Sequence, residues 1–405
     1  MKLLFITNEI PYPPDNGVRI VSYNAIRMMK EMGYSIALAI LTDEPDSVDA
    51  RFQKLLSFCD NGMAFYESLG TKSTLLTMAE SIITNEPFFV TRYYNKNFKN
   101  RLSDLITKFE PDVVHIDLLP MLQYVNDIPN SVRKIASIND SYALTLENAI
   151  ESGNYSGLMK LYKTFQLWQV KKYESKTCSL FDTSHLMTEV DATYLKNLNN
   201  EISTSVIPNG VCEDLFSIDI KNTNDINVLF IAKLEGANLV YLEKFIKGAW
   251  HLVIDECPNV KLHIVGKTGE ASEKLKNSLD KRLNLNFCGY AETLSKAYSE
   301  KDISIVPINK NCGLVNKAIE GMAAGLAVVG FNATFQGIPP AVNGENCIAV
   351  DSYEEMAKAI IEIIKDDLKR DRIRRCARKI AKEYYSWKSR MKIYNEMYFP
   401  EAKDK

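Results

Sequence analysis

The sequence predicts an α/β protein with two doubly wound parallel sheets. Short apolar runs alternate with longer helical patterns along the whole chain, they are too numerous for one sheet, and a turn-rich segment interrupts them near the middle. Apolar runs separated by helices are typical of parallel strands that helices cover on both faces. A length of 405 residues also fits two domains.

Eleven apolar runs are the expected strands. In the first half of the chain they are 3–6, 36–41, 113–116, 135–138 and 181–184, and in the second half 228–232, 262–265, 285–288, 303–306, 327–331 and 347–350. The boundary lies near 206–211, where Pro208, Asn209 and Gly210 give turn chemistry and a polar stretch follows. Ligands bind such sheets at the carboxyl ends of the strands, and two facing domains would hold a substrate in the cleft between them.

Composition narrows the class of protein. The 49 Lys and Arg residues against 51 Asp and Glu residues give a net charge of −2, which lacks the basic footprint of a nucleic-acid binder. The N-terminus has no apolar stretch of signal-peptide length, and no run approaches the roughly 20 residues of a membrane span. The eight cysteines form no CxxC pair, so we expect neither a zinc site nor disulfides, but a cytoplasmic protein with reduced thiols.

Two loops carry candidate chemistry. The first, 8–19, is stiffened by three prolines and leads through Asn16 and Gly17 into a helix, which suits a phosphate or a sugar hydroxyl. The alternative is a loop and helix cap without a ligand. The second, 307–325, passes through a polar turn with Gly313 into a helix with Lys317 and Glu320. Backbone amides at that helix start could hold a diphosphate, and Glu320 could accept hydrogen bonds from ribose hydroxyls.

These segments, taken together, resemble the retaining glycosyltransferases of family 4 (glycosyl transferases group 1). The resemblance spans the chain and is carried, in the family's order, by the loop 11–19 and by 111–115, 206–211, 262–266 and 316–329, with Tyr385-Ser386-Trp387 similar to the C-terminal return segment. It implies a GT-B fold. The expected parts are an acceptor-binding domain at 1–205, a nucleotide-sugar-binding domain at 206–385, and a helix at 386–405 that packs back on the first domain.

The resemblance also implies roles for individual residues. Donor-binding positions are Gly17, Lys233, Asn238, Tyr290, Gly313, Leu314, Val315, Lys317 and Glu320; catalytic candidates are His115, Asp117 and Lys233; the acceptor side has Asn16, Arg19 and Asp140. Three positions depart from the family pattern. Cys312 stands where many members have a glutamate that touches the donor sugar, Asp117 where many have a histidine, and Asn238 where a second phosphate-binding lysine is frequent.

The activity implied is retaining, metal-independent transfer of a sugar from a UDP- or GDP-sugar to a glycan or lipid-linked acceptor, with no further cofactor. Such a hexosyltransferase would serve bacterial-type surface polysaccharide or glycoconjugate synthesis. The alternatives are a catalytically silent GT-B subunit, which the substitutions at Cys312 and Asp117 favour, and a nucleotide-sugar epimerase. Basic segments at 88–101 and 365–392 could attach the protein to the inner face of a membrane, or could be solvated helix faces.

Overall fold

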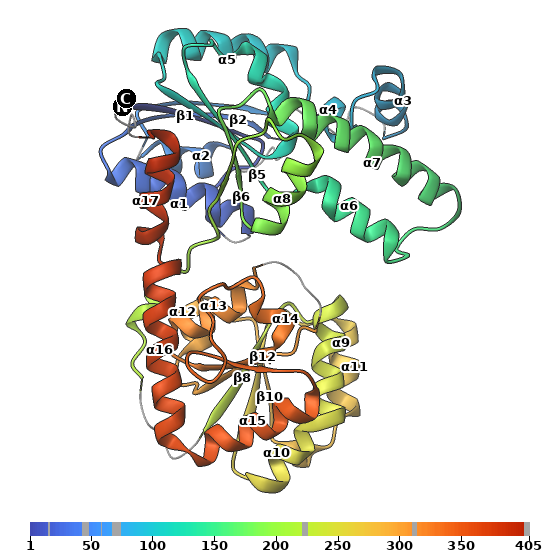
Figure 1. Ribbon diagram of the computed structural model, residues 1–405, viewed down its shortest axis with the longest axis vertical. Helices are drawn as coiled ribbons and strands as arrows, with labels where there is room; N and C mark the ends of the chain where they lie inside the picture. Colours follow the sequence, from blue (N-terminus) through green and yellow to red (C-terminus); the bar gives the residue numbers. More distant parts are fainter. Residues whose placement is uncertain are drawn as a thin grey trace. The chain divides into compact units, whose positions relative to one another are not determined.

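Each half of the chain builds its own parallel sheet. The computed structural model describes residues 1–14, 17–42, 48–57, 59–66, 74–220, 226–309 and 314–400. Two units result: unit 1 contains Met1–Pro208 and a C-terminal segment from Met391, and unit 2 contains Asn209–Arg390 (Figure 1). The sequence analysis placed the corresponding boundaries at 205/206 and 385/386.

The sheet of unit 1 has the strand order β3-β2-β1-β4-β5-β6-β7, and all neighbours are parallel. The chain moves outward from the central β1 in one direction and then, from β4, in the other, which is the doubly wound topology. The strands are β1 (Lys2–Thr7), β2 (Ser35–Thr42), β3 (Asn61–Tyr66), β4 (Val113–Asp117), β5 (Arg133–Asn139), β6 (Thr183–Leu186) and β7 (Thr204–Val206).

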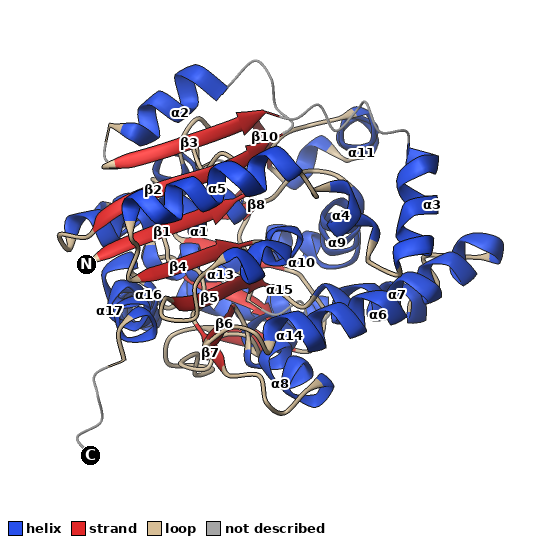
Figure 2. Ribbon diagram, turned by 90° about the horizontal axis from the view of Figure 1, so that it is seen from above, coloured by secondary structure: helices blue, strands red, loops and turns tan. Residues whose placement is uncertain are grey.

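Helices cover both faces of this sheet (Figure 2). They are α1 (Gly17–Glu31), α2 (Val48–Leu56), α3 (Thr74–Thr84), α4 (Phe88–Arg92), α5 (Lys96–Phe109), α6 (Tyr142–Glu151), α7 (Gly157–Cys178), α8 (Glu189–Leu198) and the 3-10 helix η2 (Leu119–Asp127). Along β1, Leu4 and Ile6 join one buried cluster and Leu3 and Phe5 join the other. Successive side chains of a strand point to opposite faces, so a fully apolar strand fills two cores.

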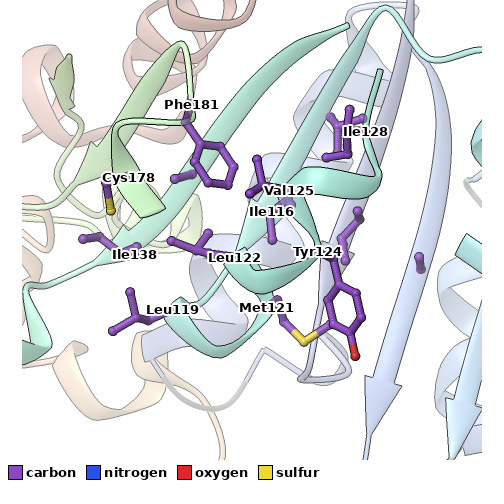
Figure 3. Packing of buried hydrophobic residues seen from close by; sticks show 14 of the residues in the cluster. Ile116, Leu119, Met121, Leu122, Tyr124, Val125, Ile128, Ile138, Cys178 and Phe181 are labelled. Atoms are coloured by element: carbon purple, nitrogen blue, oxygen red, sulfur yellow. The ribbon is translucent and has the colours of Figure 1, made fainter. Parts of the chain in front are cut away.

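Figure 3 shows part of the first core, where residues of β4 and η2 meet the end of α7. Ile116, Leu122 and Val125 pack there with Cys178 and Phe181, and all five side chains are buried. Because η2 follows β4 almost directly, its packing in this core fixes where the end of β4 lies.

Unit 2 repeats the topology with the strand order β10-β9-β8-β11-β12-β13, again parallel throughout. Its strands are β8 (Asn227–Ile231), β9 (Lys261–Val265), β10 (Leu285–Gly289), β11 (Ile303–Val306), β12 (Ala327–Phe331) and β13 (Ile348–Val350). Its helical elements are η3 (Glu213–Ser217), α9 (Gly236–Phe245), the π-helical turn η4 (Ile246–Trp250), α10 (His251–Glu256), α11 (Glu270–Ser278), η5 (Lys281–Leu283), α12 (Leu294–Tyr298), α13 (Asn316–Ala323), α14 (Asn332–Phe335), α15 (Tyr353–Lys365) and α16 (Asp367–Tyr385).

The last helix, α17 (Trp387–Tyr398), begins in unit 2 and ends in unit 1. In unit 2, Val211 donates its backbone N–H to Tyr385 O at 2.8 Å, and the Trp387 ring leaves no room for a Cβ at Gly210. In unit 1, Tyr394 and Tyr398 are buried in the second core. The segments 206–211 and 385–387, both part of the sequence resemblance, therefore meet within unit 2 at Gly210 and Val211.

The expected strands correspond to described strands, with two differences. The run 181–184 is shifted, because Phe181 packs in the core ahead of β6 (Thr183–Leu186). Two strands, β3 and β7, were not predicted. Both lie at the edges of the sheet, and β7 is only three residues long, whereas the edge strands of unit 2, β10 and β13, were predicted.

The two basic segments place much of their sequence inside the protein. In 88–101, Phe98 is fully buried and Phe89 packs edge-on against Tyr142 and Tyr173. In 365–392, Arg374 is buried and its Nε donates to Gly325 O at 2.8 Å, and Arg378 Nε donates to Ala323 O at 3.1 Å. These guanidinium groups donate hydrogen bonds to carbonyls at the C-terminal end of α13, where positive charge stabilises a helix. No helix in the described part of the chain has the length and apolar character needed to cross a membrane.

Candidate functional site

The carboxyl edge of the sheet in unit 2 brings four of the expected donor-binding residues together. Lys233 follows β8, Asn238 lies in the first turn of α9, and Lys317 and Glu320 lie on α13 after β11. Lys317 Nζ donates to Asn238 Oδ1 at 3.0 Å, and Asn238 Nδ2 donates to Lys233 O at 3.3 Å. Parallel topology explains this proximity, since β8 and β11 are neighbours and their carboxyl ends share one edge.

Glu320 is the carboxylate of this cluster. Tyr298, which is fully buried at the end of α12, donates its hydroxyl to Glu320 Oε2 at 2.9 Å. Burial raises the pKa of Glu320, while the Tyr298 hydrogen bond and the charge of Lys317 lower it. The carboxyl group is thus fixed by one donor, and it can accept further hydrogen bonds through its other lone pairs.

Lys317 and Lys233 differ in their surroundings. Lys317 is held between Asn238 and the ring of Phe230, whose centroid lies 5.8 Å from Nζ. Lys233 forms a 2.6 Å ion pair with Glu235, in which both side chains are more than 60% exposed. Exposed ion pairs are weak, so the Lys233 ammonium can exchange this partner for an anionic ligand at little cost.

The start of α13 follows this edge. Val315 is its N-cap residue, is buried, and gives no side-chain hydrogen bond to the helix, and Leu314 precedes it. Asn209 Nδ2 donates to Asn316 Oδ1 at 3.4 Å, which ties the turn 208–210 to the first residue of the helix. Gly313, expected here as a donor-binding position, and Cys312 lie outside the described residues.

The neighbouring loops after β9 and β10 pack closely. Gly266 has a φ of +154°, and a Cβ there would lie 1.7 Å from Ala232 O, next to Lys233. Gly266 N also donates to Gly289 O at 2.8 Å. Tyr290, expected to pack near a base, follows Gly289 with a side chain that is 76% exposed.

The carboxyl edge of the sheet in unit 1 holds a second polar group, centred on Asp117 at the end of β4. Ser22 Oγ donates to Asp117 Oδ2 at 2.6 Å, and Thr7 Oγ1 donates to the same oxygen at 3.4 Å. Burial raises the pKa of Asp117 to about 7 against the lowering effect of these hydroxyls. A carboxyl group of this kind exists in both protonation states near neutral pH.

Two buried asparagines flank Asp117 at the ends of neighbouring strands. Asn8 follows β1 and Asn139 ends β5, and both side chains are more than 90% buried. Within the described protein atoms, neither Asn8 Oδ1 nor Asn139 Nδ2 has a hydrogen-bond partner. A buried polar atom without a partner costs about 1–3 kcal/mol, so one acceptor and one donor at this edge are available for a ligand or ordered water.

His115 lies inside unit 1. The sequence analysis took it as the end of its strand, but β4 continues to Asp117. The His115 ring stacks on Phe5 at 4.4 Å between centroids, and its Nδ1 is 2.8 Å from the Tyr398 hydroxyl. Burial lowers the pKa of His115, so the imidazole is neutral and holds α17 to the sheet.

The remaining residues predicted in unit 1 are Gly17 and Arg19 in the first turn of α1, Asp140 after β5, and Asn16. Gly17 is the first residue of α1, where a Cβ would meet nothing within 4 Å. Arg19, two residues later, pairs with Glu9 at 3.4 Å. Asp140 follows β5, and desolvation together with nearby Asp191 raises the pKa of its carboxyl group. Asn16 lies outside the described residues.

Three residues of these edges were not singled out from the sequence: Tyr298, Ser22 and Asn139. Tyr298 and Glu320 are 22 residues apart, and no local pattern links them. Asn139 offers a signal, because it directly follows an apolar run, as Asp117 does. Among the residues that the structure describes, no three His, Cys, Asp or Glu side chains gather as a metal site would require.

Part of unit 2 matches the model of a known protein family. Residues 225–366 match the family model described as glycosyl transferases group 1, and this stretch contains Lys233, Asn238, Lys317 and Glu320. No curated protein matches the sequence.

Many solved structures share the fold over nearly the whole chain. Sucrose-phosphate synthase from Thermosynechococcus elongatus has 14% identity and a TM-score of 0.66, with 98% of each chain covered. HepE from Anabaena in complex with UDP has 14% identity and a TM-score of 0.63, covering 98% of this chain and 99% of that one. S. aureus TarM, in complex with alpha-GlcNAc-glycerol and UDP among others, has 13% identity and a TM-score of 0.66, covering 98% and 100%. The chain has the two-domain α/β GT-B fold that the sequence resemblance implied.

Proposed function

We propose that this chain is a glycosyltransferase that moves a sugar from a nucleoside diphosphate sugar to a hydroxyl group of an acceptor. The observation that carries the proposal is the cluster of Lys233, Asn238, Lys317 and Glu320 beside the start of α13, within the segment that matches glycosyl transferases group 1. UDP bound to HepE, a protein of the same fold, supports a nucleoside diphosphate as the leaving group.

In the proposed reaction, the bond between the sugar and the diphosphate breaks as negative charge develops on the diphosphate. The Lys233 ammonium and the backbone amides at the start of α13 stabilise that charge, since fixed donors and cations aimed at developing charge act without reorganisation. Glu320 accepts hydrogen bonds from the ribose hydroxyls. We take the reaction to retain the anomeric configuration, with the departing phosphate oxygen receiving the acceptor's proton, and to need no metal.

The acceptor is a glycan or a lipid-linked sugar. The edge of unit 1 supports this, because Asn8 Oδ1 and Asn139 Nδ2 supply a buried acceptor and donor beside Asp117. Such pairs suit sugar hydroxyls, each of which donates one hydrogen bond and accepts others. A role in surface polysaccharide or glycoconjugate synthesis belongs to this proposal.

The test uses the purified full chain without divalent metal and with chelator present. Its binding to UDP, GDP and the corresponding nucleotide sugars is measured by calorimetry, and release of the diphosphate is followed with added glycan acceptors. Binding of one nucleotide and transfer to an acceptor with the anomeric configuration of the donor are expected. Failure of every nucleotide to bind would overturn the proposal and favour the silent subunit, and turnover of the donor sugar without an acceptor would favour the epimerase.

A further inference from the structure

Helix α3 of unit 1 buries polar side chains and exposes apolar ones, which is the reverse of an ordinary surface helix. Its buried positions are Thr77 and Ser81, each 1% exposed, one helical turn apart. Leu75, Ile82 and Ile83 are instead 77%, 53% and 83% exposed. A surface helix of a soluble domain normally directs its apolar stripe to the core, so this helix presents its apolar face outward.

Helix α7 also exposes apolar side chains. Leu158, Leu161, Phe165 and Trp168 recur at intervals of three and four residues, which places them on one stripe of the helix. Leu158 is 85% exposed, Leu161 68% and Trp168 52%, and Phe165 stacks on Trp168. Lys172, one turn further on, lies with its Nζ 5.6 Å from the centre of the Trp168 ring.

The end of α3 contacts α7. Gln169 of α7 donates from Nε2 to Ser81 O at 2.9 Å and to Glu86 O at 3.2 Å, so α7 is joined to the end of α3 and to the residues after it. Both views of the ribbon show α3 next to α7 at one side of unit 1 (Figures 1 and 2). We call the outward faces of α3 and the first half of α7 the apolar rim.

The two halves of the apolar rim differ in charge, because α3 carries one acid, Glu80, and no lysine or arginine, whereas α7 is basic. Helix α7 carries the lysines 160, 163, 171, 172 and 176 and a single acid, Glu174. Glu174 is fully buried and accepts hydrogen bonds from Ser141 Oγ at 2.8 Å and Ala143 N at 3.1 Å. Solvent therefore meets lysines along this helix, although Lys171 also pairs with Glu147.

The apolar stripe of α7 leads to a cavity of about 290 Å³ whose lining includes Lys172, Lys176, Glu86 and Gln169. Gln169 is 1% exposed, and its Oε1 has no hydrogen-bond partner among the described protein atoms. Two ammonium groups and an acceptor oxygen suit the phosphate and hydroxyl groups of a lipid headgroup, and the Glu86 carboxylate favours a headgroup that also offers a donor.

We propose that the apolar rim docks on an anionic phospholipid bilayer, with Ile83, Leu158 and Trp168 inserting among the acyl chains and Lys172 and Lys176 contacting headgroup phosphates. Helices that lie in a membrane interface typically combine exposed apolar residues, tryptophan and lysines, as α7 does. A two-fold contact that pairs α7 with α7 of a second copy would bring their lysines against each other, which like charge disfavours. The proposal does not depend on glycosyl transfer.

The test is sedimentation of the full chain with vesicles of pure phosphatidylcholine and with vesicles containing roughly a third phosphatidylglycerol. Binding to the anionic vesicles alone, weakened by salt, is expected. The double variant Ile83→Asn/Leu158→Asn should lower the partition coefficient at least about tenfold, because two exposed apolar side chains lose their burial in lipid. Lys172→Glu/Lys176→Glu should weaken binding to the anionic vesicles by a similar factor.

Leu368→Asn is the matched control, since Leu368 is 86% exposed on α16 of unit 2. It should leave vesicle binding unchanged, and circular dichroism checks the fold of every variant. Equal binding of wild type and the α3/α7 variants, or no binding of wild type, would overturn the proposal. So would a concentration-dependent dimer in sedimentation velocity that Ile83→Asn/Leu158→Asn abolishes, which would assign the apolar rim to a second copy of the chain.

Discussion

Replacement of Glu320 by glutamine tests the donor site at its carboxylate. Glutamine keeps the size of the side chain and an oxygen that can accept the 2.9 Å hydrogen bond from Tyr298, but it removes the charge. Stability should therefore change by less than about 1 kcal/mol, as is typical when a hydrogen bond keeps both partners. Nucleotide binding should change much more.

The magnitude follows from the type of hydrogen bond lost. A ribose hydroxyl that donates to a carboxylate is worth about 1.5–3 kcal/mol, and 1.4 kcal/mol corresponds to a factor of ten in affinity. Glu320→Gln should accordingly weaken binding of the preferred nucleoside diphosphate by roughly 10- to 150-fold. Burial raises the pKa of Glu320, so acidification towards that pKa should weaken wild-type binding and bring it closer to the variant.

Calorimetry at pH 7.5 and at mildly acidic pH measures both effects, and a thermal melt measures stability. Glu383→Gln is the matched control, because Glu383 is an exposed glutamate on α16. Wild-type affinity in Glu320→Gln, with the melt unchanged, would refute the assignment of Glu320 to the ribose. An equal loss in Glu383→Gln would refute it as well, since the effect would then follow net charge.

Lys233→Ala should change the free energy of unfolding by less than about 0.5 kcal/mol, because its ion pair with Glu235 is exposed, and should strongly lower the rate of transfer; a wild-type rate would remove Lys233 from the donor site. Gly17→Ala should fold normally, since a Cβ there meets nothing within 4 Å, and should raise KM for the donor if a diphosphate approaches the backbone; an unchanged KM would contradict that approach. Asp117→Asn should stabilise the protein more at pH 8 than at pH 4. Burial raises the pKa of Asp117 from 3.8 to about 7. The protonated carboxyl group therefore contributes its full stabilisation of the folded protein below pH 3.8, and this contribution is lost as the pH rises to about 7. Thermal melts of wild type and Asp117→Asn across this pH range measure the difference, and a pH-independent difference would contradict it.

Most of the fold could be predicted from the sequence, because buried parallel strands are apolar on both faces. The run 3–6 is an example, since Leu4 and Ile6 fill one core and Leu3 and Phe5 the other. The edge strand β3 shows where this reasoning stops. Its apolar run is limited to residues 63–66, which directly follow the turn-forming pair Asn61-Gly62, and the strand was not predicted.

The candidate site could be predicted in part. Glu320 was singled out because it lies on the helix after a strand, where ligands bind a parallel sheet, and Lys233 was singled out through the family resemblance. Their hydrogen-bond partners depend on which strands are neighbours, so Tyr298 could not be assigned to Glu320 in advance. The sequence analysis assigns Arg374 and Arg378 to a basic face, whereas in the structure their guanidinium groups donate hydrogen bonds to carbonyls at the end of α13.

The sequence by itself determined the two parallel sheets, the loops that carry polar chemistry and the family resemblance, because these depend on local residue patterns. Only the tertiary structure decided which of those residues meet and which side chains face outward. Thr77 and Ser81 are buried while Ile83 is exposed, whereas hydrophobic periodicity alone predicts the opposite orientation. The direction that an amphipathic helix faces depends on its neighbours, which for α3 are α4 and α7, the latter bound through Gln169 to Ser81.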